Sequence, residues 1–108
     1  MKNLASLLHH LPSPLQEVEH AVFSQLGLRL LVKRDDLLHP HVSGNKWRKL
    51  KHNLLDAHRM GFAKLISFGG AFSNHLAAVA AAGSEFGFET VGIVRGERSG
   101  ELNPTLHF

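Results

Sequence analysis

The order of elements in residues 64–96 limits the fold more than any other feature of the sequence. The apolar run KLISF at 64–68 predicts a buried strand, and ETVGIVRG at 89–96 predicts another. Between them, the alanine-rich stretch 74–86 predicts a helix, because alanine is the best helix former, and Gly87 is placed to end it. Two strands joined by a helix of this length form a right-handed crossover between parallel strands.

A parallel sheet has to be covered by helices on both faces. We therefore predict an α/β protein with a three-layer parallel sheet and right-handed crossovers. Two or three strands and two complete helices are too few to close such a core, and the last predicted helix has only begun at Pro104. We expect the 108 residues to be the N-terminal piece of a longer protein.

Three further elements are predicted before this unit. Residues 4–11 favour a short helix, and LRLLVKR at 28–34 favours a strand that breaks at the paired aspartates. A helix is expected at 45–60, with Ser43 or Asn45 as its cap and a left-handed glycine just beyond its end. Its apolar stripe has spacings of three and four residues and contains Trp47, Leu50, Leu54 and His58.

Composition and charge exclude several classes of function. The net charge of +3 is mild and the basic residues are scattered, so we expect neither nucleic acid nor a membrane as a partner. The absence of cysteine excludes disulfides and thiolate zinc sites and agrees with a cytoplasmic protein. The nine histidines lack the i, i+4 pairing with a carboxylate that a helical zinc site needs, so we predict no metal site. The apolar run LAAVAAA is far too short to cross a bilayer.

The stretch SGNKWRKL at 43–50 places Lys46 in the first turn of the predicted helix. The helix macrodipole disfavours an ammonium there by up to about 1 kcal/mol, and Lys49 lies three residues away, where like charges repel. One interpretation is that Lys46 is simply an exposed lysine on a basic helical face. The other is that it is a neutral amine that acts as a nucleophile. The local pattern leaves both open.

The stretch GGAFSN at 69–74 predicts a tight turn that leads from the strand into the start of the next helix. In open α/β sheets, ligands bind beyond the carboxyl ends of the strands, and free N–H groups at a helix start bind anions. Ser73, Asn74 and His75 lie at this point, so a phosphate or a carboxylate is the expected ligand. The pattern is neither a dinucleotide-binding fingerprint nor a Walker loop. The alternative is that Ser73 is an ordinary N-cap and the glycines an ordinary turn.

Three stretches together resemble one enzyme family. VKRDDL, SGNKWRKL and FGGAFSNHLAAVAAAG are similar, in this order, to the KRDD or KRED, GNK-x-x-KL and GG-x-x-SN-[QH] motifs of the 1-aminocyclopropane-1-carboxylate deaminase and D-cysteine desulfhydrase family. The likeness covers about residues 28–95. It implies a partial fold type II pyridoxal-phosphate fold, similar to the tryptophan synthase β subunit. Residues 1–44 would then belong to the large domain, and residues 45–108 would carry the reactive lysine and the start of the small domain.

The resemblance implies a role for each matching residue. Lys46 would form the Schiff base with pyridoxal 5′-phosphate and later move the substrate's proton, so it would be both catalytic and cofactor-binding. Asn74 would hydrogen-bond the 3′-hydroxyl of the cofactor. Ser73, also expected to take part in catalysis, would hold the substrate carboxylate with the backbone N–H groups of Asn74 and His75. Lys49 would help to polarise that region.

The implied reaction is deamination or β-elimination of a small amino acid by an intact, homodimeric protein. The SNH sequence at 73–75 is more similar to the desulfhydrases, whereas deaminases usually have glutamine in place of His75. The family's phosphate-binding loop is expected beyond Phe108, so these residues are expected to be inactive alone. The alternative function is that of a non-catalytic α/β module that binds an anion, or assembles with a partner, at Ser73.

Overall fold

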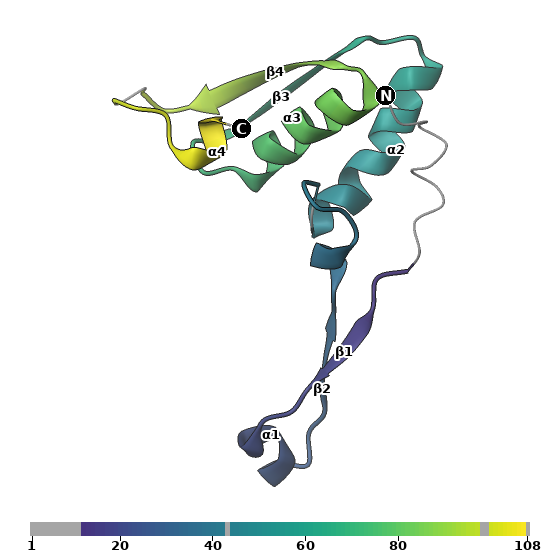
Figure 1. Ribbon diagram of the computed structural model, residues 1–108, viewed down its shortest axis with the longest axis vertical. Coiled ribbons are helices and arrows are strands. Elements are labelled where there is room, and N and C mark those ends of the chain that lie inside the picture. The colour runs from purple at the N-terminus through teal and green to yellow at the C-terminus, as the bar shows by residue number, and fades with distance from the viewer. Residues whose placement is uncertain (1–11, 43, 98–99, 108) are drawn as a thin grey trace.

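The computed structural model describes residues 12–42, 44–97 and 100–107 of the chain, which form an arm and a body (Figure 1). The helix expected at residues 4–11 lies outside the described part. The arm holds the strands β1 (Leu15–Val18) and β2 (Leu30–Lys33), with the short helix α1 (Ala21–Gln25) at its tip. A 3₁₀ turn, η2 (Asp35–Leu37), leads into the body, which consists of α2 (Asn45–Arg59), β3 (Lys64–Gly70), α3 (Asn74–Phe86), β4 (Glu89–Arg95) and α4 (Pro104–His107).

The parallel pair expected in the body is confirmed. β3 and β4 lie side by side in parallel, in a continuous register from Lys64 opposite Glu89 to Gly70 opposite Arg95. β3 is two residues longer than predicted, because Gly69 and Gly70 pair with β4 instead of forming the turn. The turn that leads into α3 is therefore confined to Ala71 and Phe72.

The core of the body lies between α2, α3 and one face of the β3–β4 pair. α2 and α3 contribute the buried residues Trp47, Leu50, Leu54, Ala78, Val79, Ala81, Ala82 and Phe86. Burial of a leucine such as Leu54 stabilises the fold by about 1.5–3 kcal/mol. His58, which was predicted on the same stripe, is exposed. It lies in the last turn of α2, where a basic side chain in solvent complements the negative end of the macrodipole.

The helix ends follow the predictions only in part. The N-cap of α2 is Gly44, which has no side chain to offer, and its φ of 62° lies in the left-handed region. Asn45, one of the two predicted caps, is instead the first helical residue, and the other, Ser43, lies outside the described part. Gly61 and Gly87 follow α2 and α3 with φ of 76° and 80°, as predicted, because glycine adopts this conformation at little cost.

Only one face of the β3–β4 pair is covered within the described chain. Alternate side chains of a strand point to opposite faces, and Leu65 points toward the core. On the opposite face Ile66, Phe68 and Ile93 are 66%, 79% and 57% exposed. The helical layer that a three-layer arrangement needs on that face is not among the described residues, so the three-layer fold remains a prediction.

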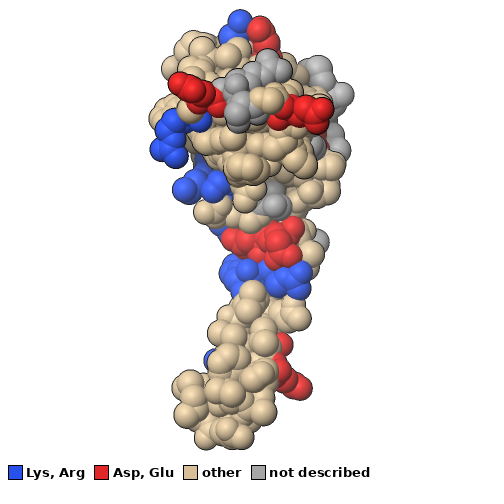
Figure 2. Space-filling view, turned by 90° about the vertical axis from the view of Figure 1, so that its left-hand side faces the viewer, with Lys and Arg blue, Asp and Glu red and all other residues tan. Residues whose placement is uncertain are grey.

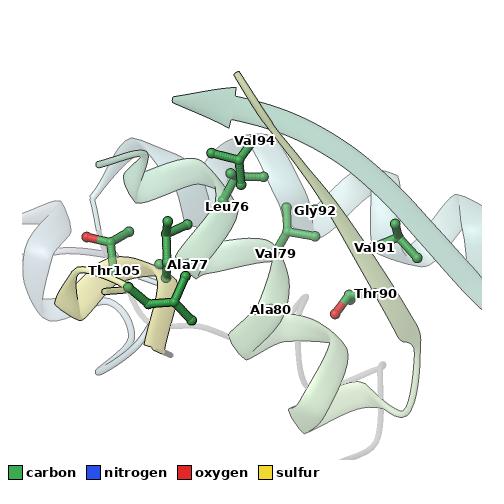
Figure 3. A pocket seen from close by; sticks show the side chains of 11 residues that line it. Leu76, Ala77, Val79, Ala80, Thr90, Val91, Gly92, Val94 and Thr105 are labelled. Atoms are coloured by element: carbon green, nitrogen blue, oxygen red, sulfur yellow. The ribbon is translucent and has the colours of Figure 1, made fainter. Parts of the chain in front are cut away.

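A small apolar cavity lies on the covered face, between α3, β4 and α4 (Figure 3). Its volume is about 270 Å³, and Leu76, Val79 and Val94 are among its lining residues. α4 begins at Pro104, as predicted, and contributes Thr105 to the lining. None of the lining residues belongs to the predicted site, so this cavity is part of the packing of the body.

The arm differs most from the prediction. The strand expected at residues 28–34 is shortened to β2, and it pairs with β1 in an antiparallel hairpin instead of joining β3 and β4. Neither β1 nor α1 was predicted, because their short exposed sequences carry no helical or strand periodicity. No helix in the described ranges combines the length and apolar character that crossing a bilayer requires.

Candidate active site

Lys46 lies in the first turn of α2, as the sequence predicted. Its side chain is half-buried, and its Nζ donates a hydrogen bond of 2.9 Å to Asn45 Oδ1. Among the described residues, no side chain caps the start of this helix. Lys49 follows three residues later on an exposed part of the helix. The start of α2 therefore carries two cationic side chains.

Ser73 lies at the start of α3 and acts as its N-cap. The Ser73 hydroxyl accepts a hydrogen bond of 3.3 Å from the Leu76 N–H. Asn74, the first helical residue, is exposed. The end of β3 approaches this turn so closely that a Cβ added to Gly69 would lie 2.6 Å from Ser73 Oγ. The glycine at this position is therefore what lets the strand reach the helix start.

His75 lies in the first turn of α3 and contacts β3. Its Nε2 lies 2.8 Å from the hydroxyl of Ser67, which points to the same face of β3 as Leu65. Burial of the imidazole lowers its pKa, and the charges of Lys46 and Lys49 lower this pKa further. Burial and these two positive charges favour the neutral form of the His75 side chain.

The positive charges of Lys46 and Lys49 thus act on His75, and we call these three residues the electrostatic cluster. Ser73 and Asn74 lie next to His75 in the chain, but within the described part no hydrogen bond joins either of them to Lys46. A groove of about 290 Å³ between α2, β3 and α3 has His75 and Ser67 in its wall. The candidate site therefore combines two lysines at the start of α2 with the capped start of α3.

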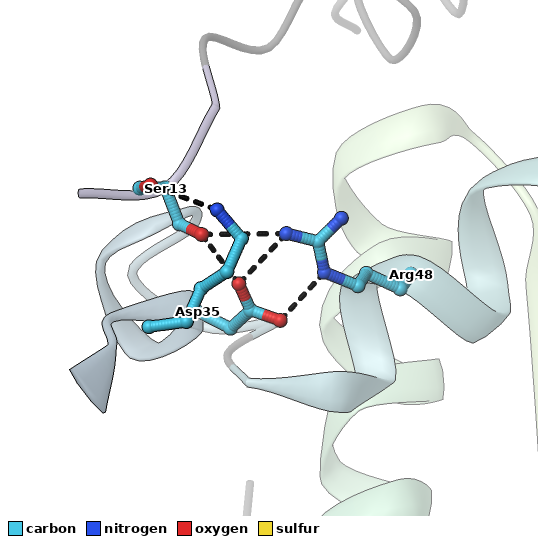
Figure 4. A network of polar contacts seen from close by, with 4 residues as sticks. Ser13, Asp35 and Arg48 are labelled. Atoms are coloured by element: carbon cyan, nitrogen blue, oxygen red, sulfur yellow. Dashed lines mark hydrogen bonds and ion pairs between the residues drawn. The ribbon is translucent and has the colours of Figure 1, made fainter. Parts of the chain in front are cut away.

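A polar network ties the start of α2 to the arm (Figure 4). The Asp35 carboxylate accepts hydrogen bonds from Arg48 Nε at 2.5 Å and Arg48 Nη2 at 2.7 Å, and from the Ser13 hydroxyl at 2.5 Å. The Asp35 carbonyl also accepts a bond of 3.0 Å from the Gly44 N–H. Figure 2 shows a band of acidic and basic side chains across this junction, above an arm tip that is largely uncharged. The KRDD stretch therefore helps to hold the helix that carries Lys46.

Sequence analysis missed two residues that lie beside the site. One is Ser67, whose contact with His75 joins positions eight residues apart and has no sequence signature. The other is Asn103, whose Nδ2 donates a bond of 2.9 Å to the Ala71 carbonyl in the turn before α3. Asn103 Oδ1 also accepts from the Leu106 N–H at 3.1 Å. Asparagine directly before a proline is a recognisable helix start, so Asn103 could have been found.

The chemistry of these side chains suits an organic anion with a reactive carbonyl carbon. The cations and the free N–H groups of a helix start attract negative charge. The Lys46 amine, if neutral, can attack a carbonyl carbon. The Ser73 hydroxyl and the Asn74 amide add neutral hydrogen-bonding groups at the second helix start.

The chain is similar in sequence to several known proteins. A comparison with profiles of protein families finds no match. A Pyrococcus abyssi protein provisionally named a 1-aminocyclopropane-1-carboxylate deaminase is 42% identical over 73 residues, which are 68% of this chain and 22% of that protein. The D-cysteine desulfhydrase of Salmonella paratyphi B is 34% identical over 98 residues, covering 81% of this chain and 30% of the enzyme.

A solved structure agrees with these sequence relatives. The crystal structure described as that of an ACC deaminase homologue superposes with a TM-score of 0.71 at 29% identity, over 87% of this chain and 31% of the other. The chain thus spans less than a third of the length of the proteins that it matches. The matched proteins have the names of enzymes, or of an enzyme's homologue. The resemblance predicted from the three motifs is confirmed: the chain is a relative, in sequence and in fold, of the 1-aminocyclopropane-1-carboxylate deaminase and D-cysteine desulfhydrase family.

Proposed function

We propose that this chain supplies the reactive lysine and the substrate-carboxylate site of an enzyme that uses pyridoxal 5′-phosphate to deaminate a small amino acid or to catalyse β-elimination from it. The observation that carries this proposal is the groove between α2, β3 and α3 with His75 in its wall, together with Lys46 in the first turn of α2 and Ser73 as the N-cap of α3. Such chemistry uses a lysine amine as nucleophile and a helix start as an anion site. The names of the related proteins point to the same class of reaction.

The residues present fit this cofactor. Pyridoxal phosphate carries an aldehyde and a phenolic hydroxyl, and the site offers the Lys46 amine and the Asn74 amide, each suited to one of them. When bound, the cofactor supplies an electron sink for the charge that develops on the substrate. Lys46 would hold it through Nζ, and Asn74 would donate a hydrogen bond to its hydroxyl.

Residues of the chain itself would bind the substrate and move its proton. The Ser73 hydroxyl and the N–H groups of Asn74 and His75 would bind the substrate carboxylate at the positive end of the α3 macrodipole. Lys49 adds positive charge to the same region. The Lys46 amine, when released, would take the proton from the substrate's α-carbon as a general base. The Ser67 hydrogen bond would hold the His75 ring in place while the carboxylate binds.

The cofactor proposal is tested by visible absorbance and chemical labelling. Addition of pyridoxal phosphate should give a new absorbance band that is lost in Lys46→Ala and kept in Lys51→Ala, the matched control on the same helix. Borohydride reduction followed by peptide mapping should place the phosphopyridoxyl label on Lys46. A label on Lys49 or Lys51 would refute the assignment. Weak anion binding without a band would favour the non-catalytic module instead.

We further propose that the intact protein prefers D-cysteine to the cyclopropane amino acid. The reason for this proposal is His75 in the SNH sequence, which stands in place of the glutamine usual in deaminases. D-cysteine would give pyruvate, ammonia and sulfide, whereas opening of the cyclopropane ring would give 2-oxobutyrate and ammonia. Rates of sulfide and 2-oxobutyrate release from the two substrates should differ in favour of sulfide. Faster release of 2-oxobutyrate would contradict this preference.

A further inference from the structure

His39 is a buried titratable residue that the proposed reaction does not use. It lies in the loop between η2 and α2, and only 5% of it is exposed. Its ring stacks on the indole of Trp47, with 5.1 Å between the ring centroids and 7° between the planes. Trp47 is 2% exposed and follows Lys46 directly in the first turn of α2. His39 therefore lies against the turn that carries the reactive amine.

The hydrogen bonds of His39 determine which of its nitrogens carries the proton. Nδ1 accepts two backbone N–H groups of its own loop, from His41 at 3.2 Å and from Val42 at 3.0 Å. A nitrogen that accepts has no proton, so the neutral ring carries its proton on Nε2. Nε2 lies 2.8 Å from the carboxylate oxygen Oε2 of Glu85, near the end of α3, which is an ion-pair distance.

We propose that His39 is a positioning residue for Lys46, and that its neutral form latches the loop before α2 against the first turn of that helix. The latch has two parts, which are the stack on Trp47 and the two N–H bonds from His41 and Val42 that close the loop. Protonation of Nδ1 removes the lone pair that closes the loop. It therefore releases the segment that leads into Lys46.

The groups around His39 act in opposite directions on this protonation. In the described part of the chain, α3 contributes the Glu85 carboxylate, which favours the imidazolium. The loop contributes His41, whose ring centroid lies 6.4 Å away and which disfavours the imidazolium when it is itself charged. α2 contributes the uncharged Trp47. Burial and the two accepted N–H groups favour the neutral ring, so the latch is closed at high pH and opens in acid.

The fluorescence of Trp47 tests this latch directly, because the chain contains one tryptophan and no tyrosine. We expect the emission of the full chain to fall and shift to the red as the pH decreases through the range in which histidines titrate, about pH 8 to 5. The backbone N–H resonances of Val42 and Lys46 should shift with the same midpoint. A flat emission profile, or a Lys46 resonance that does not follow the emission, would overturn the proposal.

Three variants separate His39 from the other titrating groups. His41→Gln, in the same loop, should keep the emission transition. His39→Gln should lose it, and a transition that persists in this variant would overturn the proposal. Glu85→Gln removes the negative charge that favours the imidazolium, so the midpoint of the emission transition should move to lower pH in this variant. An unchanged midpoint in Glu85→Gln would also contradict the latch, even if His39→Gln failed to fold.

The inference rests on the proposed function only for the role of Lys46. Absence of a Lys46-dependent absorbance band would refute the cofactor proposal and leave the pH transition of Trp47 intact. A normal band with a flat emission profile would refute the latch alone. The two failures are therefore distinguishable in the same protein preparation.

Discussion

The Asp35 side chain links three parts of the chain at the scale of single residues. It accepts hydrogen bonds from Arg48 in α2 and from Ser13 before β1, and it begins η2. The bond from Arg48, followed by that from Ser13, holds the pKa of the Asp35 carboxyl well below its ordinary value, and the charges of Arg48 and Lys33 add to this effect. The folded state therefore favours a charged Asp35.

The pH dependence of stability should report this network. Because the pKa of Asp35 is lower in the folded state, the unfolded chain binds more protons in acid. The stabilisation is complete above the ordinary aspartate pKa, near 4, and is lost as the pH falls below it. In Asp35→Asn we expect a lower urea midpoint at pH 7 than in the wild type. We also expect this midpoint to fall less than that of the wild type between pH 5 and pH 3. Asp56→Asn, which breaks an exposed pair with Arg59, should leave both nearly unchanged.

A second prediction at this scale concerns the electrostatic cluster of the site. Burial, then Lys46 and then Lys49, lowers the pKa of His75. Removal of one cation in Lys49→Gln should therefore raise this pKa, while burial keeps it below the ordinary histidine value of about 6.5. An NMR titration of the imidazole proton shifts measures the pKa of His75. Lys64→Gln, whose side chain pairs with Glu89, is the control and should cause no change. Equal shifts in both variants would show that Lys49 does not face His75.

At the scale of elements, the packing of α3 on β4 depends on one small residue. Gly83 lies within α3, and a Cβ built there would lie 2.2 Å from Thr90 Cγ2 and 3.0 Å from the Phe88 carbonyl oxygen. The missing side chain lets the helix approach the strand, and Ala82 beside it is fully buried. A glycine inside a helix costs about 1 kcal/mol relative to alanine, so close packing offsets a loss in helix propensity.

Gly83→Ala should therefore destabilise the body although alanine favours the helix. Overpacking typically costs about 1–3 kcal/mol, against a propensity gain of about 1 kcal/mol. In the double variant Gly83→Ala with Thr90→Ser, the second substitution removes the Thr90 Cγ2 methyl group that the new Cβ would contact. Urea or thermal unfolding should show that part of the lost stability is restored. A Gly83→Ala protein that is more stable than the wild type would contradict the close approach of α3 and β4.

At the scale of the whole molecule, the described residues leave much apolar surface uncovered. The Cα radius of gyration is 17.4 Å, compared with about 13 Å for a compact domain of this length. The outer face of the β3–β4 pair exposes large side chains such as Phe68 and Ile93, and the arm exposes Leu15 and Leu26. Patches of this kind are typical of surfaces that pack against other protein.

We therefore expect the 108-residue chain alone to associate and to show no turnover with added pyridoxal phosphate. Its sedimentation should indicate species heavier than 11.9 kDa, because exposed apolar faces and unpaired strand edges pair with other copies. Ile93→Lys on the outer sheet face should reduce association. Met60→Lys, at an exposed apolar position beyond α2, should not. A monomer with one cooperative unfolding transition and full turnover would contradict this prediction.

Local structure was the part that the sequence alone determined. The ends of α2 and α3 were predicted to within one residue. The parallel order of β3 and β4 and the left-handed conformation of Gly61 were also predicted. These features depend on hydrogen bonds and side-chain periodicity within a few residues. Lys46 and Ser73 were also predicted at helix starts, because helix starts follow from local capping and dipole rules. The family was predicted from the resemblance of the three motifs.

Contacts between distant residues were decided by the tertiary structure. The pairing of β1 with β2, the Ser67–His75 bond and the His39–Glu85 contact each join residues that no local pattern relates. Even the end of β3 depended on such a contact, because its two glycines become strand residues only where β4 supplies their partners. Local propensity cannot predict these pairs, since their stability comes from packing and burial that exist only once the elements have come together.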